Sequence, residues 1–224
     1  EETREAVWQR FDQLDQIGVV NKEDALTAES GIGCYNISKY NFDLLTRDPN
    51  NILSNMNQYI LGYSENIQEI LNGFRFQQQV AELNKKGLLY ALVEKFSNID
   101  LHPNVVSNVE MGYAFEELLR RFSEMSNETA GEHYTPKEAT KLLAGIVMTG
   151  DKDALNKKGK IKSAYDPTCG TGGILSSAED FIKRYYPHIT LELYGQELMD
   201  ESYAIAKADM LLKGYDEENI RLGN

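Results

Sequence analysis

The sequence has little cysteine and histidine, and it has no long apolar run. Only two of its 224 residues are cysteines, Cys34 and Cys169, which excludes a disulfide framework, and three histidines are too few for a zinc-type cluster. No segment approaches the roughly 20 consecutive apolar residues of a membrane span. The first residues, Glu1-Glu2-Thr3-Arg4, lack the pattern of a signal peptide. We therefore expect a cytoplasmic, reduced and metal-free protein.

Positive charge is also scarce. Lysine and arginine total 23 against 35 aspartates and glutamates, which gives a net charge of −12. Residues 1–130 carry −9 of this charge and residues 131–224 carry −3. A protein that grips a phosphate backbone alone usually has a basic face. If nucleic acid is a ligand, most of the grip must come from another chain.

The first 110 residues are predicted to form helices joined by polar loops. Apolar residues recur at steps of three and four in Asn66–Leu71, Val80–Phe96 and Tyr113–Met125, as on the buried face of a helix. Asp48–Asn51 and His102–Asn104 are typical of turns. The residues expected on the buried faces are Val80, Leu83, Leu88, Ala91, Leu92, Phe96, Phe115, Leu118, Leu119, Phe122 and Met125. We expect an all-helical N-terminal domain over residues 1–110.

From Gly131 onward, helix and strand patterns alternate. Thr135-Pro136-Lys137-Glu138 predicts a helix start, with Thr135 as N-cap, Pro136 in the first position and Glu138 completing a capping box. The stripe expected to be buried on this helix is Ala139, Leu142, Leu143, Ile146 and Val147.

Three short strands are predicted in the last third of the chain, at Ile161–Tyr165, Thr190–Tyr194 and Asn219–Leu222. Helical patterns over Ile174–Tyr185 and Ala204–Leu212 separate them. Strands that alternate with helices open a parallel, doubly wound sheet. The fold class expected for residues 111–224 is therefore α/β.

A glycine-rich loop follows the first predicted strand, with the sequence Asp166-Pro167-Thr168-Cys169-Gly170-Thr171-Gly172-Gly173. Such a turn at the carboxyl edge of a parallel sheet binds ligands, because glycines allow close approach and the next helix offers free N–H groups. Glu197 ends the second strand, where a carboxylate can accept hydrogen bonds from both ribose hydroxyls. The pattern predicts a site for a nucleoside-containing cofactor.

The identity of the cofactor follows from charge and spacing. The dinucleotide fingerprint G-x-G-x-x-G fails, since Leu175 takes the place of its third glycine, and Asp166 would repel a pyrophosphate. S-adenosylmethionine fits better, because its carboxylate suits a helix N-terminus and its cations suit acidic groups. The alternative is that Gly170, Gly172 and Gly173 only make a tight turn. Cys169 is interpreted as a small loop residue, not a nucleophile.

At this point the sequence resembles a known family. The loop Asp166–Gly173 looks like the S-adenosylmethionine loop of amino-methyltransferases that act on DNA. The segment Gly131–Lys137 is similar to the one that precedes this loop in the modification (M) subunit of type I restriction–modification systems. Tyr194–Glu197 and Asn219–Gly223 also match that family. The resemblance spans about residues 110–224 and implies a Rossmann-like S-adenosylmethionine-dependent methyltransferase sheet, preceded by the helical domain.

The resemblance also implies site residues. In the family, the Tyr-Thr-Pro segment packs over the methionine end of the cofactor, whereas from the residues alone Thr135 and Glu138 are only capping residues. His133 stands where the family more often has an aromatic residue, so its role is not carried over. The expected cofactor-binding residues are Glu132, His133, Tyr134, Thr135, Pro136, Lys137, Asp166, Gly170, Thr171, Gly172, Gly173 and Glu197.

The family's catalytic motif, Asn-Pro-Pro-Phe/Tyr, is missing from this sequence. Its Asn and a backbone carbonyl accept the hydrogens of the adenine amino group, and its aromatic ring stacks on a base flipped out of the duplex. None of the five prolines is followed by another, so no catalytic residue can be named. We expect residues 111–224 to be the first half of a methyltransferase domain in a fragment that ends before the motif.

The resemblance implies a reaction and partners. The order of the motifs implies transfer of a methyl group to adenine N6 in DNA, since neither Cys34 nor Cys169 has the Pro-Cys context of C5-cytosine enzymes. It implies double-stranded DNA, a specificity (S) subunit, a second M subunit and a restriction (R) subunit as partners. The acidic residues 1–110 are interpreted as a subunit or DNA contact surface, or equally as a solvated face. Two alternatives stay open, an NAD-type Rossmann oxidoreductase and a non-catalytic helical interaction module.

Overall fold

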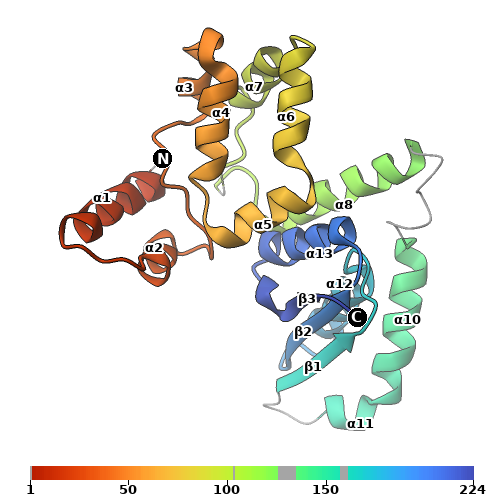
Figure 1. Ribbon diagram of the computed structural model, residues 1–224. Coiled ribbons are helices and arrows are strands. Elements are labelled where there is room, and N and C mark those ends of the chain that lie inside the picture. The colour runs from red at the N-terminus through yellow and green to blue at the C-terminus, as the bar shows by residue number, and fades with distance from the viewer. Residues whose placement is uncertain (1, 103, 126–134, 157–160) are drawn as a thin grey trace. The chain divides into compact units, whose positions relative to one another are not determined.

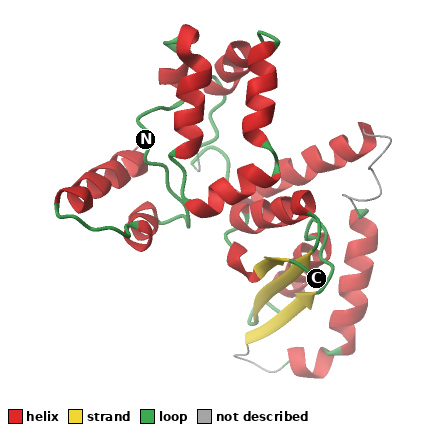
Figure 2. Ribbon diagram, viewed as in Figure 1, coloured by secondary structure: helices red, strands yellow, loops and turns green. Residues whose placement is uncertain are grey.

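The chain folds into two compact units, Glu1–Val105 and Val106–Asn224. The computed structural model describes residues 2–102, 104–125, 135–156 and 161–224 (Figure 1). In the described residues the first unit is helical, and the second combines helices with a parallel sheet (Figure 2). No helix among the residues described is both long and apolar enough to cross a membrane.

The first unit is a set of short helices. Its elements are α1 (Glu2–Gln16), α2 (Glu23–Ser30), α3 (Phe42–Thr46), a 3-10 turn (Pro49–Asn51), α4 (Ile52–Leu61), α5 (Glu65–Gly73), α6 (Phe76–Lys85) and α7 (Leu89–Ser97). The main core of this unit consists of Leu45, Ile52, Met56, Ile60, Val80, Leu89 and Val93. The helical pattern at Asn66–Leu71 lies within α5, and the turn predicted at Asp48–Asn51 contains the 3-10 turn.

The prediction of one continuous helical pattern over Val80–Phe96 is wrong, because α6 ends at Lys85 and α7 begins at Leu89. The chain turns at Gly87, whose φ of 70° is left-handed, and α7 starts in a new phase. Leu88, Leu92 and Phe96 are therefore exposed, whereas Leu89 is buried.

The second unit begins with helices and continues as alternating strands and helices. Its elements are α8 (Asn108–Met125), α10 (Lys137–Gly150), α11 (Lys152–Leu155), β1 (Ile161–Asp166), α12 (Gly173–Tyr185), β2 (Thr190–Glu197), α13 (Asp200–Leu212), a 3-10 turn (Glu217–Asn219) and β3 (Ile220–Leu222). Helix α8 packs on α13, so it belongs to this unit. Leu118 on α8, which the sequence predicted to be buried, is 54 % exposed. The predicted burial of Phe122 and Met125 lies outside the described side chains.

The sheet is parallel with the order β1-β2-β3. Helix α12 contacts β1 and β2, and α13 contacts β2 and β3. Two right-handed crossovers in the same direction place both helices on one face of the sheet. On that face Leu191 and Leu193 of β2 are buried, while Glu192 between them is exposed. The strands predicted from the sequence are thus confirmed, and β2 runs on to Glu197.

Helix α10 differs from the prediction at its start and on its buried face. It begins at Lys137 with Pro136 as N-cap, and no side chain in the described part of the chain caps it, so the capping box of Thr135 and Glu138 is wrong. Its buried residues are Thr140, Ala144 and Met148. The predicted stripe is wrong as well, because its larger members are 46–68 % exposed: Leu142, Leu143, Ile146 and Val147. Helix α12 packs closely on α10 through the smaller side chains.

Candidate functional site

The glycine-rich loop leaves β1 at Asp166 and turns into α12 at Gly173. One carboxylate oxygen of Asp166 accepts a hydrogen bond of 3.0 Å from the backbone N–H of Thr168, which starts the turn. The N–H of Gly172 donates to the carbonyl of Cys169 over 2.8 Å. Gly170 and Gly172 have φ values of 56° and 82°, in the region that favours glycine. The backbone of the loop therefore favours glycine at these two positions.

Glu197, at the end of β2, binds this loop. Its Oε2 accepts a hydrogen bond of 2.8 Å from the N–H of Gly170. Its Oε1 accepts bonds of 2.8 Å each from the N–H groups of Leu198 and Met199. A carboxylate has about four acceptor positions, so one on Oε2 is left. In this arrangement the carboxylate of Glu197 has one acceptor position for a further hydrogen-bond donor, whereas the sequence analysis expects it to accept two hydroxyl groups.

Close packing under the loop depends on Gly195 of β2. A Cβ atom there would lie 2.8 Å from the Sγ of Cys169 and 2.9 Å from the Cδ1 of Ile220. Burial, together with the charges of Asp166 and Glu197, raises the pKa of the Cys169 thiol to about 12. The thiol stays protonated at neutral pH, which agrees with a packing role for Cys169.

The N-terminus of α12 follows the glycine-rich loop directly, and its first backbone N–H groups can bind a ligand. Its N-cap is Gly172, and none of the side chains that the structure describes caps it. The first N–H groups of a helix have no partner within the helix. The amides of Gly173 and Ile174 are therefore available to an anion, and the helix dipole favours a negative charge there. Leu198, Met199 and Leu222 at the neighbouring strand ends are 44–66 % exposed and offer apolar contacts.

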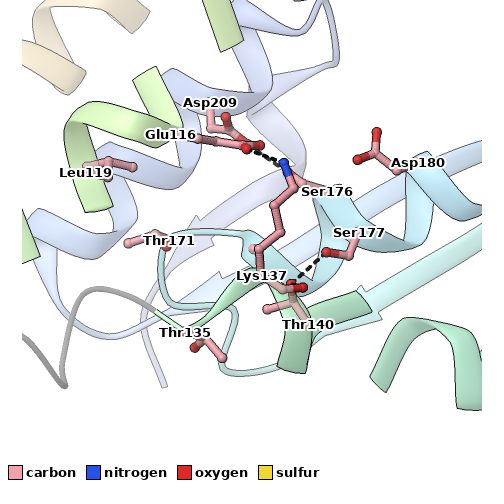
Figure 3. Close-up of a pocket in the computed structure, with 11 residues that line it drawn as sticks. Glu116, Leu119, Thr135, Lys137, Thr140, Thr171, Ser176, Ser177, Asp180 and Asp209 are labelled. Atoms are coloured by element: carbon pink, nitrogen blue, oxygen red, sulfur yellow. Dashed lines mark hydrogen bonds and ion pairs between the residues drawn. The ribbon is translucent and has the colours of Figure 1, made fainter. Parts of the chain in front are cut away.

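A small cavity, lined mostly by residues with polar or charged side chains, lies where α8, α10, α12 and α13 meet (Figure 3). Its volume is about 50 Å³, enough for ordered water. It brings together four residues that the sequence predicted separately, Thr135, Lys137, Thr171 and Gly173. The other lining residues are Glu116, Leu119, Thr140, Ser176, Ser177, Asp180 and Asp209.

The remaining predicted residues lie elsewhere. Asp166, Gly170, Gly172 and Glu197 belong to the loop and the strand ends and do not line this cavity. Pro136 is exposed at the start of α10. The predictions for Glu132, His133 and Tyr134 lie outside the described residues. No group of acidic, histidine or cysteine side chains that could bind a metal occurs in the described ranges.

A charged network that the sequence did not predict borders the cavity. Lys213 Nζ contacts Asp209 Oδ2 at 2.7 Å and Glu116 Oε1 at 2.9 Å. Glu116 Oε2 contacts Lys137 Nζ at 2.6 Å. Ser176 Oγ donates to Asp209 Oδ2 over 2.8 Å. The network connects the start of α10 to the first turns of α12.

Burial and charge act oppositely on the two carboxyl groups of this network. Burial raises the pKa of Glu116, but its hydrogen bonds and ion pairs with Lys137 and Lys213 lower it more, so the pKa lies below the usual value. Burial dominates at Asp209 and raises its pKa despite the ion pair with Lys213. Asp209 is 4 % exposed, and its Oδ1 has no partner among the described atoms. A water in the cavity would satisfy this atom.

Comparison with known proteins gives one family and several relatives. The family model N-6 DNA Methylase matches residues 107–224. The type I restriction enzyme MjaIX methylase subunit of Methanocaldococcus jannaschii is 32 % identical over 132 residues, which cover 58 % of this chain and 22 % of that protein. The type I restriction enzyme EcoEI methylase subunit of Escherichia coli is 31 % identical over 136 residues, covering 58 % of this chain and 25 % of that protein.

A solved structure has the same fold. It is the type I restriction-modification system methyltransferase subunit from Streptococcus thermophilus, with a TM-score of 0.62 and 21 % identity. The match covers 99 % of this chain and 51 % of that one. The chain thus corresponds to about half of the solved subunit, and its matched segments to about a quarter or less of the curated relatives.

Proposed function

Because the chain belongs to the N-6 DNA methylase family, we propose that it carries the cofactor-binding part of the modification subunit of a type I restriction–modification system. Membership of this family confirms the resemblance drawn from the sequence motifs, and the solved relative confirms the methyltransferase fold. The proposed reaction of the whole protein is transfer of a methyl group from S-adenosylmethionine to adenine N6 in a specific DNA sequence. The observation that carries the proposal is the pairing of Glu197 with a glycine loop and an open helix N-terminus.

The residues of the loop fit this cofactor. The left-handed Gly170 and Gly172 keep side chains away from the ligand. The amides at the start of α12 would bind the methionyl carboxylate, and the remaining acceptor position of Glu197 would bind one ribose hydroxyl. The exposed apolar side chains of Leu198 and Met199 would contact the purine. When bound, the cofactor supplies a methyl group on a sulfonium, and the loop, the helix amides and Glu197 orient it and keep it in place.

An NAD-type oxidoreductase fits less well. Leu175, at the place of the third glycine of the dinucleotide fingerprint, is 2 % exposed and packs in the core, so its side chain is needed there. Asp166 ends β1 directly before the loop, where its charge disfavours a pyrophosphate. A non-catalytic interaction module would need neither the left-handed glycines of the loop nor its contact with Glu197.

Partners follow from the same proposal. The whole protein would act on double-stranded DNA in the cytoplasm, together with a specificity subunit, a second modification subunit and a restriction subunit. Residues 1–130 carry a net charge of −9, which suits contact with a basic protein surface better than with phosphates. We assign subunit contact to the helical residues 1–110 and cofactor binding to residues 111–224.

Calorimetric titration with S-adenosylhomocysteine and with NAD tests this proposal. We expect S-adenosylhomocysteine to bind and NAD not to bind. Binding of NAD alone would favour the oxidoreductase, and binding of neither would favour the interaction module.

A matched pair of variants tests the position of the ligand carboxylate. Aspartate and asparagine both tolerate the left-handed backbone of Gly172, and a Cβ atom there would be 3.5 Å from Met210 Cε, an ordinary contact. Gly172→Asp adds a negative charge at the start of α12, and Gly172→Asn is its neutral control. We expect Gly172→Asp to weaken S-adenosylhomocysteine binding at least about tenfold more than Gly172→Asn. Equal affinities of the two variants would contradict this placement.

A further inference from the structure

All three N–H donors of the Lys213 ammonium group are hydrogen-bonded within the second unit. Lys213 follows α13 as the C-cap, and its side chain is 17 % exposed. Its three N–H donors have three acceptors: Asp209 Oδ2 at 2.7 Å, Ser176 Oγ at 2.8 Å and Glu116 Oε1 at 2.9 Å. A lysine ammonium has no donor beyond these three. The contacts therefore fix Lys213 from three different helices.

Helix α8 is shaped to receive this side chain. Gly112 is buried, and a Cβ atom there would lie 3.4 Å from both Cγ and Cε of Lys213, at the lower limit of ordinary van der Waals contact. Glu116 follows Gly112 by one helical turn and so lies on the same face of α8. The glycine admits the stem of Lys213, and the glutamate meets its ammonium group.

Glu116 connects Lys213 to the start of α10, because it contacts both Lys213 and Lys137. Its second oxygen contacts Lys137 Nζ at 2.6 Å, and Lys137 is the first residue of α10. Among the described residues no side chain caps this helix. Two contacts tie its first residue to α8: the ion pair with Glu116 and the ring of Tyr113, whose centroid lies 5.1 Å from Lys137 Nζ. Lys137 and Thr171 line the same cavity, one from α10 and one from the glycine loop (Figure 3).

Stability alone does not account for such a network. Burying charged groups costs solvation, and packed apolar residues at such places are often as stabilising as ion pairs. A network in which every donor of the ammonium group has its own buried acceptor can instead fix the position of the elements that it joins. Here the fixed elements are the first turns of α10 and α12, which flank the cavity.

We propose that Lys213 is a positioning residue for cofactor binding: through Glu116 it holds Lys137 and the start of α10 against the glycine-rich loop Asp166–Gly173. The inference rests on the proposed function, because it assumes that the cofactor binds between these segments. Lys213 does not touch the ligand in this proposal. Its effect on affinity passes through Glu116.

A double-mutant cycle on the 224-residue chain tests the inference. Lys213→Met removes the charge and keeps the stem beside Gly112, and Glu116→Gln removes the bridging charge. We expect each to raise the Kd for S-adenosylhomocysteine about tenfold, within the range of couplings between linked residues. If both act through one linkage, the double variant also has a Kd about tenfold above wild type, whereas independent effects would multiply to about a hundredfold.

Two further variants separate positioning from general destabilisation. Lys162→Met is the matched control, since Lys162 pairs with Asp151 at 2.9 Å and lies at the opposite end of β1 from the loop. We expect it to leave the Kd unchanged. Lys213→Arg keeps the charge and is expected to restore affinity to within about threefold of wild type, although its planar fork differs from an ammonium. Denaturation curves establish that each variant is folded at the titration temperature.

The outcomes are distinct. Wild-type affinity in folded Lys213→Met, multiplicative effects in the cycle, or an equal loss in Lys162→Met would each overturn the inference while the proposed function stands. If wild type itself binds no S-adenosylhomocysteine, the proposed function fails and the inference with it. If Lys213→Met does not fold, Glu116→Gln and Lys213→Arg decide: loss in the first with retention in the second supports the inference, and any other pattern overturns it.

Discussion

Replacing Glu197 by glutamine is expected to weaken both the loop and the cofactor site, although the two side chains have the same shape. The carboxylate accepts three backbone N–H groups, two on Oε1 and one on Oε2. Glutamine has a single acceptor oxygen. If this oxygen stays with Leu198 and Met199, the NH₂ group of the introduced glutamine faces the N–H of Gly170. A donor then meets a donor at the point where the loop is attached.

The magnitude follows from this count. A hydrogen bond to a charged acceptor contributes about 1.5–3 kcal/mol, and the Gly170 bond is only half-buried, so water replaces part of it. We expect the free energy of unfolding to fall by about 1–2 kcal/mol. The NH₂ group also removes the acceptor position proposed for the ribose. The Kd for S-adenosylhomocysteine should rise by about 10- to 100-fold.

Urea denaturation and calorimetry measure the two effects separately. Glu192→Gln is the control, because Glu192 is exposed on the same strand and, within the described ranges, its one hydrogen bond is from the hydroxyl of Tyr194, at 3.1 Å. That variant should match wild type in both assays. A second ligand, 2′-deoxy-S-adenosylhomocysteine, isolates the ribose contact, and wild type should prefer the ribose form. If Glu197→Gln keeps both that preference and the wild-type stability, the double role of Glu197 in the loop and the ribose site is refuted.

Four further expectations follow from the structure. Gly195→Ala should lower the free energy of unfolding in urea by about 1–3 kcal/mol, because its Cβ atom would clash with Cys169. Gly145→Ala, whose Cβ atom would be 3.9 Å from Phe181, should raise it by about 0.5–1 kcal/mol. A Gly195→Ala variant that is more stable than Gly145→Ala would contradict the packing. Ile146→Ala should cost less than about 0.5 kcal/mol and Met148→Ala about 2–4 kcal/mol, because the first side chain is exposed and the second is buried; equal costs would restore the stripe predicted from the sequence. Because the pKa of Glu116 is lowered in the folded state, its carboxylate contributes stability that is fully present above its unfolded pKa of about 4.3 and is lost as the pH falls through the lower folded pKa. The stability difference between wild type and Glu116→Gln should therefore shrink as the pH falls below about 4.3, and a difference that grows would reverse the assigned sign. Incubated with labelled S-adenosylmethionine and adenine-containing duplex DNA, the 224-residue chain should transfer no label, because it has no Asn-Pro-Pro segment; measurable transfer would show that other residues serve catalysis.

Local patterns were sufficient for the strands and the loop. Alternation over a few residues identified β1, β2 and β3, and the glycines between Asp166 and Gly173 marked the turn that joins a strand to a helix. Glu197 was placed at the strand end for the same reason. These features depend on neighbours in sequence, which is why they could be predicted.

The buried face of α10 could not be found in this way. Its large apolar residues and its small ones, such as Thr140 and Ala144, both recur at helical spacing, and only packing against α12 selects the small set. The predicted start of α10 was also wrong, because a local sequence rule does not decide where the helix begins. The residues Thr135 to Glu138 satisfy a capping rule, but the helix begins after Pro136 instead.

The network around Lys213 could not be predicted from the periodicity of the sequence. Lys213 and Glu116 are 97 residues apart, and in sequence each resembles an ordinary surface charge. The available signals were the spacing of Asp209 and Lys213 by one helical turn and of Gly112 and Glu116 by another. Neither indicates burial, which depends on how α8 and α13 meet.

Glu197 also determines how this end of the sheet opens. Its side chain accepts the amides of Gly170, Leu198 and Met199, and its carbonyl accepts the amide of Gly223 over 2.8 Å. These four amides come from the loop, the strand end and the residue after β3. The bonds from Leu198 and Met199 are local, whereas those from Gly170 and Gly223 join Glu197 to the loop and to the residue after β3, so separating the ends of the strands breaks these two together. In a hydrogen–deuterium exchange experiment the amides of Gly170 and Gly223 should open as one cooperative group, so the ligand-binding loop exchanges at the rate of the strand ends and not at that of a free turn.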